Sequence, residues 1–211
     1  MADGSNRRPL KTRSAGWAKL LAGALRRTGI SPNAISTLGI FCAAGGAWAF
    51  LLARDDPWWF LGAALGIQLR LLANMLDGMV AVEGGRQSPT GPLFNEVPDR
   101  IEDALLLIGA GYAANMPELG YGAALLAFAT AYIRMTGGAL GFAQDFVGPM
   151  AKQHRMFVLT VGAIVAAFGP AIAALDSPQP VIEGILWVIV AGAAVTCVKR
   201  LSRIARQLEA R

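Results

Sequence analysis

Four polar side chains stand out in this sequence because they lie in or beside apolar segments at helical spacing. Asn74 and Asp77 are three residues apart near the end of one apolar run, and Asn95 and Asp99 are four residues apart near the start of the next. Side chains at these intervals share one face of a helix. If the two faces pack together, two carboxylates and two amide oxygens meet in one site.

These four side chains could bind a divalent cation. Carboxylate and amide oxygens are hard ligands that suit Mg²⁺ or Mn²⁺. Zinc would favour sulfur or paired histidines, but Cys42 and Cys197 lie in separate apolar stretches and His154 is the only histidine. The alternative is that the polar groups only hydrogen-bond between helices. Their clustering favours function, because ionisable groups inside a membrane cost roughly a few kcal/mol each.

The composition predicts that membrane helices carry these residues. Hydrophobic residues make up 55% of the 211 and charged residues 16%, and the mean hydropathy is +0.47, which is unlike a soluble domain. The formal charge of +5 could suggest nucleic acid, but seven of the nineteen Lys and Arg residues lie in the first 27 residues and five in the last 13. Basic clusters that flank apolar segments fit membrane topology and anionic headgroups better. We therefore expect membrane lipids and no nucleic acid as partners.

Turn residues and charges separate six apolar segments of about the 20 residues that a membrane-spanning helix needs. We predict an all-α bundle over 34–198, with spans at about 34–53, 58–82, 98–115, 118–142, 156–175 and 181–198. Residues 14–28 have an apolar side and a basic side, which predicts an amphipathic interfacial helix. No repeat or long linker divides the chain, so we predict one membrane-embedded domain, 1–211, with a basic tail at 199–211.

The distribution of basic residues predicts the orientation. The N-terminal segment, the connection with Lys152 and Arg155, and the tail all lie on one side of the predicted bundle. By the positive-inside rule that side is cytoplasmic. We therefore expect both termini and the polar site on the cytoplasmic face of the cell (inner) membrane.

A second group of basic residues, Arg134, Lys152 and Arg155, is predicted on the same side. Such side chains could hold a phosphate group, although Lys152 and Arg155 could equally contact lipid headgroups. Arg134 lies among apolar residues and needs an anion or an acidic partner, such as Asp145 or Asp103. Arg70 falls on the helical face of Asn74 and is expected to pair with a carboxylate.

At these positions the sequence resembles the CDP-alcohol phosphotransferase (CDP-alcohol phosphatidyltransferase) family, whose signature is D-x2-D-G-x2-A-R-x8-G-x3-D-x3-D. This chain reads N-x2-D-G-x2-A-V-x8-G-x3-N-x3-D from Asn74 to Asp99, so every spacing is kept. The residues that differ are Asn74, Val82 and Asn95. The segment from Leu93 to Asp99 resembles a divergent bacterial branch with Asn at two of the four Asp positions.

The resemblance implies metal-dependent transfer of a phosphatidyl or phospho-alcohol group from a CDP-linked donor, above all CDP-diacylglycerol, to an acceptor hydroxyl in phospholipid biosynthesis. CMP is released, and the acceptor is not identified. It also implies a homodimer and a set of site residues. Asn74, Asp77, Asn95 and Asp99 would hold two Mg²⁺ or Mn²⁺ ions, Asp99 would act as base, Asn74, Gly78, Ala81 and Gly91 would contact the CDP moiety, and Arg134, Lys152 and Arg155 would contact a donor or acceptor phosphate.

The two asparagines lower the formal charge of the ligand set from four to two. One metal site would then be weak, or Glu96, Glu102 or Asp103 would supply charge from nearby. Arg86 could replace the signature arginine that is lost at Val82. Two further functions stay open, which are a catalytically silent protein that binds lipid or nucleotide and a small transporter.

Overall fold

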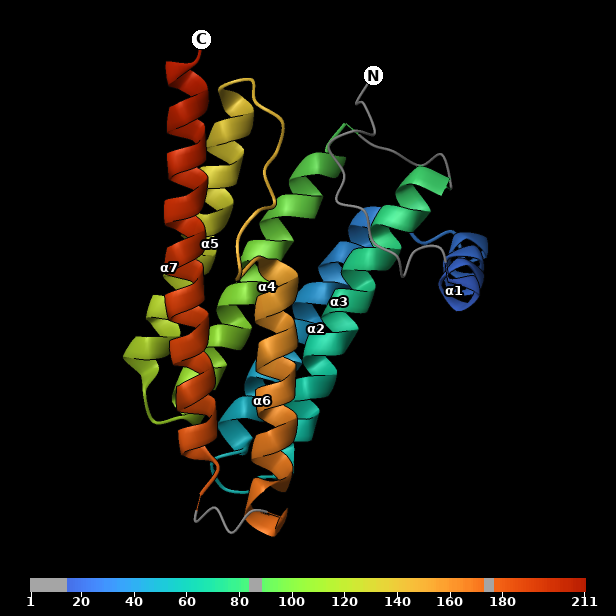
Figure 1. Cartoon of the computed structure of the whole chain (residues 1–211). Helices are drawn as coiled ribbons and strands as arrows, with labels where there is room; N and C mark the ends of the chain where they lie inside the picture. The colour runs from blue at the N-terminus through green and yellow to red at the C-terminus, as the bar shows by residue number, and fades with distance from the viewer. Residues whose placement is uncertain (1–14, 84–88, 173–176) are drawn as a thin grey trace.

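A computed structural model describes residues 15–83, 89–172 and 177–211, and throughout these ranges the chain forms helices and no strands (Figure 1). This confirms the all-α class. The seven helices in the described residues are α1 (Gly16–Arg27), α2 (Pro32–Leu52), α3 (Trp59–Glu83), α4 (Gly91–Ala113), α5 (Pro117–Ala139), α6 (Lys152–Ile172) and α7 (Gln179–Glu209).

Local sequence explains where several helices begin. The Ser31 hydroxyl accepts a hydrogen bond from the Ala34 backbone N–H at 3.1 Å, and Pro32 occupies the first turn of α2, where its missing N–H costs nothing. α4 begins at Gly91, earlier than the span predicted from Pro98. The four-residue intervals from Gly91 to Asp103 already indicated one continuous helical face. Pro98 lies two turns inside α4, where it cannot donate a backbone hydrogen bond to the Phe94 carbonyl, and the helix still continues to Ala113.

The helices α2 to α7 alternate in direction along the bundle (Figure 1). α2 packs on α3 and α4, and α5 packs on α4 and α7. α6 begins part of the way along the bundle, because the segment between α5 and α6 runs down from the end where α7 terminates (Figure 1). α7 continues to Glu209, so most of the predicted basic tail is helical. In the same view α1 lies beside α3, apart from the other helices.

Within the described residues, three helices are long and apolar enough to cross a membrane, at Pro32–Leu52, Trp59–Val82 and Gln179–Glu209. This agrees with the apolar composition and indicates an integral membrane protein. Close packing of α2 on α3 uses glycines, since a Cβ atom built on Gly66 would lie 2.5 Å from the Gly46 Cα atom. Such close contact between backbones is typical of helix pairs in membranes. It holds α3 firmly beside α2 and so positions the polar face of α3.

The core is divided into an apolar part and a polar part. Buried apolar side chains such as Phe50, Phe60 and Leu106 fill the contacts between α2, α3 and α4. Further along α3 and α4, the buried side chains include charged groups, among them Arg70, Glu102 and Asp103. This polar part of the core contains the residues described next.

Candidate active site

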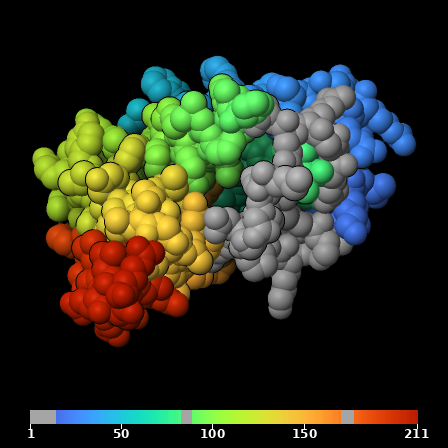
Figure 2. All heavy atoms as spheres, turned by 90° about the horizontal axis from the view of Figure 1, so that it is seen from above, coloured from blue at the N-terminus to red at the C-terminus, as the bar shows by residue number. Residues whose placement is uncertain are grey.

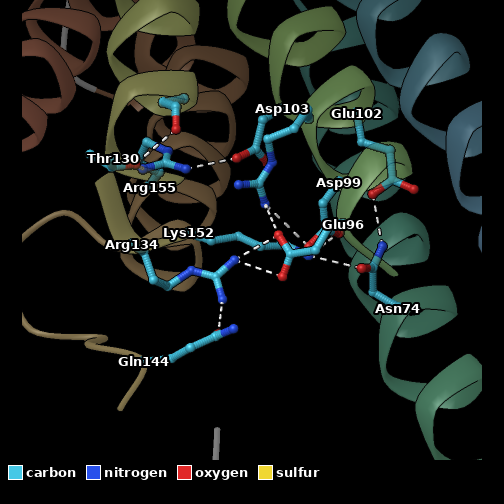
Figure 3. A network of polar contacts seen from close by, with 12 residues as sticks. Asn74, Glu96, Asp99, Glu102, Asp103, Thr130, Arg134, Gln144, Lys152 and Arg155 are labelled. Atoms are coloured by element: carbon cyan, nitrogen blue, oxygen red, sulfur yellow. Dashed lines mark hydrogen bonds and ion pairs between the residues drawn. The ribbon is translucent and has the colours of Figure 1, made fainter. Parts of the chain in front are cut away.

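The polar core joins side chains from four helices (Figure 3). Seen from above, the molecule is hollowed beside α4, between that helix and the segment that follows α5 (Figure 2). The residues of the network are Arg70, Asn74 and Asp77 on α3, Glu96, Asp99, Glu102 and Asp103 on α4, Thr130 and Arg134 on α5, and Lys152 and Arg155 on α6.

Asn74 and Asp99 meet at the ammonium group of Lys152, the first residue of α6. The Lys152 Nζ atom donates to the Asn74 Oδ1 atom at 2.8 Å and also to the Asp99 Oδ1 atom. The polar faces predicted for α3 and α4 therefore do turn toward one another.

Asp77 lies one turn beyond Asn74 on α3. Its side chain is buried, and its Oδ2 atom accepts a hydrogen bond from the Ser36 hydroxyl of α2 at 2.5 Å. Its Oδ1 atom is buried and has no hydrogen-bond partner among the described residues. A buried carboxylate oxygen is rarely left without a partner, so this atom is available to a ligand. The Glu102 Oε1 atom is buried without a partner in the same way.

Asn74, Asp77 and Asp99 present the kind of oxygen atoms that bind a divalent cation, although the described residues contain no cluster of three acidic, histidine or cysteine side chains that could hold a metal ion. The oxygen atoms of Asn74 and Asp99 already converge on one cationic group, the Lys152 ammonium, and the Asp77 Oδ1 atom is available. All three are hard oxygen ligands. Asn95 is exposed and lies one turn before Asp99 on α4, so its side chain is outside the network.

Arg70 pairs with carboxylates, as predicted. Its side chain is fully buried, and its Nη1 atom lies 3.0 Å from the Glu102 Oε2 atom and 3.7 Å from the Asp99 Oδ1 atom. Its Nη2 atom donates to the Asp103 Oδ1 atom. The other Asp103 oxygen accepts from the Arg155 Nη2 atom at 2.7 Å. Asp103 thus joins α3, α4 and α6 through two buried guanidinium groups.

Arg155 is buried inside the protein rather than turned toward lipid headgroups. Besides Asp103, its guanidinium contacts the Met150 carbonyl at 3.0 Å and the Thr130 hydroxyl at 3.3 Å. Arg200 on α7 approaches the same region, since its Nη1 atom donates to the Thr130 carbonyl at 2.5 Å. Arg200 was not predicted as a site residue, because its place in a basic segment gave no sign that it turns inward.

Arg134 has an acidic partner, as predicted, but the partner is Glu96 and neither of the suggested residues, Asp145 and Asp103. The Arg134 Nη2 atom contacts both oxygens of Glu96, at 2.7 and 2.6 Å. Asp145 pairs instead with Arg203 at 3.3 Å, and Asp103 is already shared by two other arginines. Glu96 takes this role because it precedes Asp103 by seven residues, two helical turns, on α4.

The positions expected to contact a CDP moiety lie near this network. Gly78 and Ala81 follow Asn74 by four and seven residues, so they share its face of α3. Both are half-buried, as is Gly91 at the start of α4, whereas Val82 is exposed. Arg86 lies outside the described residues.

Besides Arg200, the roles of Glu102 and Ser36 in the site were not predicted from the sequence. Glu102 follows Asp99 by three residues and so could have been placed on the same face. It was considered only as a nearby source of charge, but it hydrogen-bonds directly to Asn74 at 2.7 Å. Ser36 had no such signal, because a serine in an apolar helix is unremarkable until its neighbour is known.

Comparison with known proteins identifies the family of this chain. Residues 29–198 match the family described as CDP-alcohol phosphatidyltransferase. A phosphatidylinositol phosphate synthase of Mycolicibacterium smegmatis is 27% identical over 207 residues, which cover 92% of this chain and 87% of that protein.

Solved structures of the Mycobacterium tuberculosis phosphatidylinositol phosphate synthase share the fold. The structure with CDP-DAG bound has a TM-score of 0.75 at 23% identity and covers 90% of this chain and 94% of its own. The structure in complex with manganese and citrate has a TM-score of 0.75 at 22% identity, over 89% and 88% of the two chains. Because the family match spans most of the sequence, from residue 29 to residue 198, the predicted resemblance is confirmed and the chain belongs to the CDP-alcohol phosphatidyltransferase family.

Proposed function

We propose that this protein transfers a phosphatidyl group from CDP-diacylglycerol to an acceptor hydroxyl and releases CMP, as a step in phospholipid biosynthesis. The family supports the reaction class. The observation that carries the proposal is the convergence of oxygen atoms from Asn74 and Asp99 on a cationic group, beside a buried Asp77 oxygen that has no partner in the described residues. A diphosphate donor needs such a site, because its charge has to be neutralised as the leaving group departs.

The residues that would hold Mg²⁺ or Mn²⁺ are Asn74, Asp77, Asn95 and Asp99. When bound, the metal offsets the negative charge of the donor diphosphate and of the departing CMP. Asp77 and Asp99 would carry the formal charge of this set, and the two asparagines would contribute neutral carbonyl oxygens. We propose two metal positions, of which the one nearer Asn95 is weaker.

Asp99 is our proposed general base. The acceptor oxygen bonds to the phosphorus that carries the diacylglycerol, the bond from that phosphorus to the CMP oxygen breaks, and the acceptor proton passes to the Asp99 carboxylate. Lys152 now contacts Asp99 and Asn74. As donor and metal bind, its ammonium would exchange these oxygens for phosphate oxygens, which are equally good acceptors for it.

The acceptor that we propose to test first is a phosphorylated polyol such as inositol phosphate. Relatives named phosphatidylinositol phosphate synthase support this choice, and so does the concentration of cations around Thr130. Arg155 and Arg200 both contact Thr130, and Arg134 lies one turn further along α5. An acceptor phosphate would compete with Asp103 and Glu96 for these guanidinium groups.

We also propose that α2 to α7 all span the membrane and that α1 lies on its cytoplasmic surface. The alternating helix directions support six spans, and the charges of α4, α5 and α6 are largely paired inside the protein. On α1, Trp17 and Leu20 are exposed while Ala18 and Ala22 pack inward, as suits an interfacial helix. Labelling of single cysteines from either side of inverted membrane vesicles tests this topology, with Cys42 and Cys197 replaced by alanine.

We also propose a homodimer, as the family resemblance implies. Measurement of the mass of the protein in detergent tests this oligomeric state.

The reaction is tested with purified protein in detergent, CDP-diacylglycerol, Mn²⁺ or Mg²⁺, and a panel of acceptors that includes inositol, inositol phosphate, glycerol phosphate and serine. We expect CMP release with at least one acceptor, lost in Asp99→Asn and after chelation of the metal. CMP release that survives both changes would refute the mechanism. Binding of CDP-diacylglycerol with no CMP release under any condition would instead support the catalytically silent protein, which Asn74, Val82 and Asn95 keep open as the alternative.

A further inference from the structure

The side-chain amide of Asn74 has a defined orientation. On one side its Nδ2 atom donates to the Glu102 Oε2 atom at 2.7 Å and to the Arg70 carbonyl at 3.2 Å. On the other side its Oδ1 atom accepts from the Lys152 Nζ atom at 2.8 Å. A carboxylate only accepts and an ammonium only donates, so no flipped amide could satisfy both neighbours. The carbonyl oxygen of Asn74 is therefore turned toward Asp99 and the proposed metal.

Glu102 is built into the protein at this place. Its side chain is fully buried, and its Oε2 atom also accepts from the Arg70 Nη1 atom at 3.0 Å. Its Oε1 atom lies against α2, where a Cβ atom built on Gly39 would be only 2.5 Å away. The absence of a side chain at Gly39 leaves the space that this carboxylate occupies. Two contacts from α3 and the gap on α2 hold Glu102 in one position.

We propose that Glu102 is a positioning residue for Asn74 and that the two form a matched pair. Glu102 supplies the negative charge that the family signature places at position 74, and its carboxylate directs the Asn74 carbonyl oxygen to the metal. The role toward metal rests on the proposed function, whereas the pairing itself does not. An aspartate at position 74 would place one carboxylate oxygen about 2.7 Å from another, as the present contact shows, and like charges at that distance repel.

The formal charges of the buried network agree with this pairing. Its acidic members are Asp77, Asp99, Glu102 and Asp103, and its basic members are Arg70, Arg100, Lys152 and Arg155. The charges balance, so the network is formally neutral without a metal. With aspartate at position 74 and Glu102 retained, one negative charge would be left. Charge at 74 and charge at 102 are thus alternatives, and exchanging them leaves the total unchanged.

A double-mutant cycle in metal-free protein tests the pair. We expect Asn74→Asp to lower the apparent melting temperature by several degrees. Adding Glu102→Gln to this variant should restore most of the lost stability, because the glutamine amide can donate to the new carboxylate. In the wild-type background Glu102→Gln should give no such gain. Glu118 is an exposed glutamate in the first turn of α5. Glu118→Gln is therefore the control for the effect of removing one acidic charge elsewhere in the protein. If the Asn74→Asp variant cannot be purified in a folded form, the yield of folded double variant is measured instead, and folded double variant shows the same rescue.

An equal effect of Glu102→Gln in both backgrounds, or a double variant no more stable than Asn74→Asp alone, would overturn the pair. A second measurement, Mn²⁺ binding by electron paramagnetic resonance, tests the positioning role. Glu102→Ala should weaken Mn²⁺ binding about 10- to 100-fold, as loss of a group that orients a metal ligand typically does. Glu102→Gln should weaken it less, because its oxygen can still accept from Asn74.

The two measurements separate the two proposals. If Glu102→Ala binds Mn²⁺ as tightly as wild type while Asp77→Asn does not, Glu102 has no positioning role. If wild type itself binds no Mn²⁺, the proposed function loses its metal site and the positioning role falls with it. The melting cycle then still decides whether Asn74 and Glu102 are paired.

Discussion

Asp103→Asn tests whether the buried ion pairs hold the three helices together. The Asp103 carboxylate is 1% exposed and lies between the guanidinium groups of Arg70 and Arg155, which are 0% and 1% exposed. Asparagine keeps the size of the side chain but removes the charge. Its amide can accept from one arginine and must turn a donor toward the other. Arg70 would keep Glu102 and Asp99 as acidic neighbours, but Arg155 would lose the one carboxylate that it pairs with among the described residues.

The expected cost follows from this burial. Removing one partner of a buried ion pair destabilises a protein by about 3–5 kcal/mol, because an uncompensated charge stays inside. For a chain of this size, each kcal/mol lowers the melting temperature by about 2–4 °C. We therefore expect a loss of about 6–20 °C, measured by tryptophan fluorescence in detergent. The chain has five tryptophans, none of them in this network.

Asp145→Asn is the matched control. It also removes an aspartate that pairs with an arginine, but the side chain of its partner Arg203 is 55% exposed, and such pairs contribute about 0–1 kcal/mol. We expect a loss of at most about 4 °C. If Asp103→Asn is no more destabilising than Asp145→Asn, the buried network does not hold α3, α4 and α6 together, and the reasoning fails.

Four other substitutions have expected effects of different sign. Gly39→Ala would place a methyl group 2.5 Å from a buried carboxylate oxygen and should destabilise the protein by about 1–3 kcal/mol. Gly45→Ala is the control in the same helix. Its methyl group would meet nothing within 4 Å, so it should stabilise the protein slightly in thermal unfolding. Asn95→Asp should tighten Mn²⁺ binding severalfold in paramagnetic resonance titrations, and unchanged affinity would exclude Asn95 as a ligand. Lys152→Met should also tighten Mn²⁺ binding, because the ammonium competes for the same oxygen atoms. The same variant should release CMP more slowly. Weaker Mn²⁺ binding would contradict the proposed competition.

Spacing within one helix could be predicted from the sequence, and contacts between helices could not. The positions of Asn74 and Asp99 on facing helical surfaces follow from intervals of three and four residues and from the cost of burying polar groups in a membrane. Their meeting at Lys152 depends on α6 beginning inside the bundle, and nothing in the residues before Lys152 indicates that depth. For the same reason Lys152 and Arg155 could be taken for headgroup contacts.

That the buried charges have partners could be predicted from the sequence, but which residues these partners are could not. Charge cost alone required an acid for Arg134, but several acids lay within reach along the chain, and the choice of Glu96 depends on how α4 is rotated against α5. The membrane boundaries show the same limit. α7 continues beyond its apolar stretch to Glu209, since basic residues favour a helix C-terminus as readily as they favour a cytoplasmic tail.

The two asparagines that depart from the family signature are not equivalent. Asn74 is held between a carboxylate and an ammonium, so its neutral amide is the side chain that this environment demands. Asn95 is exposed on α4, and no described residue forces it to be neutral. If the protein had lost its function, neither asparagine would be needed, and no residue would have been selected to pair with Asn74. The fitted pair at Asn74 and Glu102 therefore argues for a site that has been rearranged and kept, with its charge moved from a metal ligand to the residue behind it.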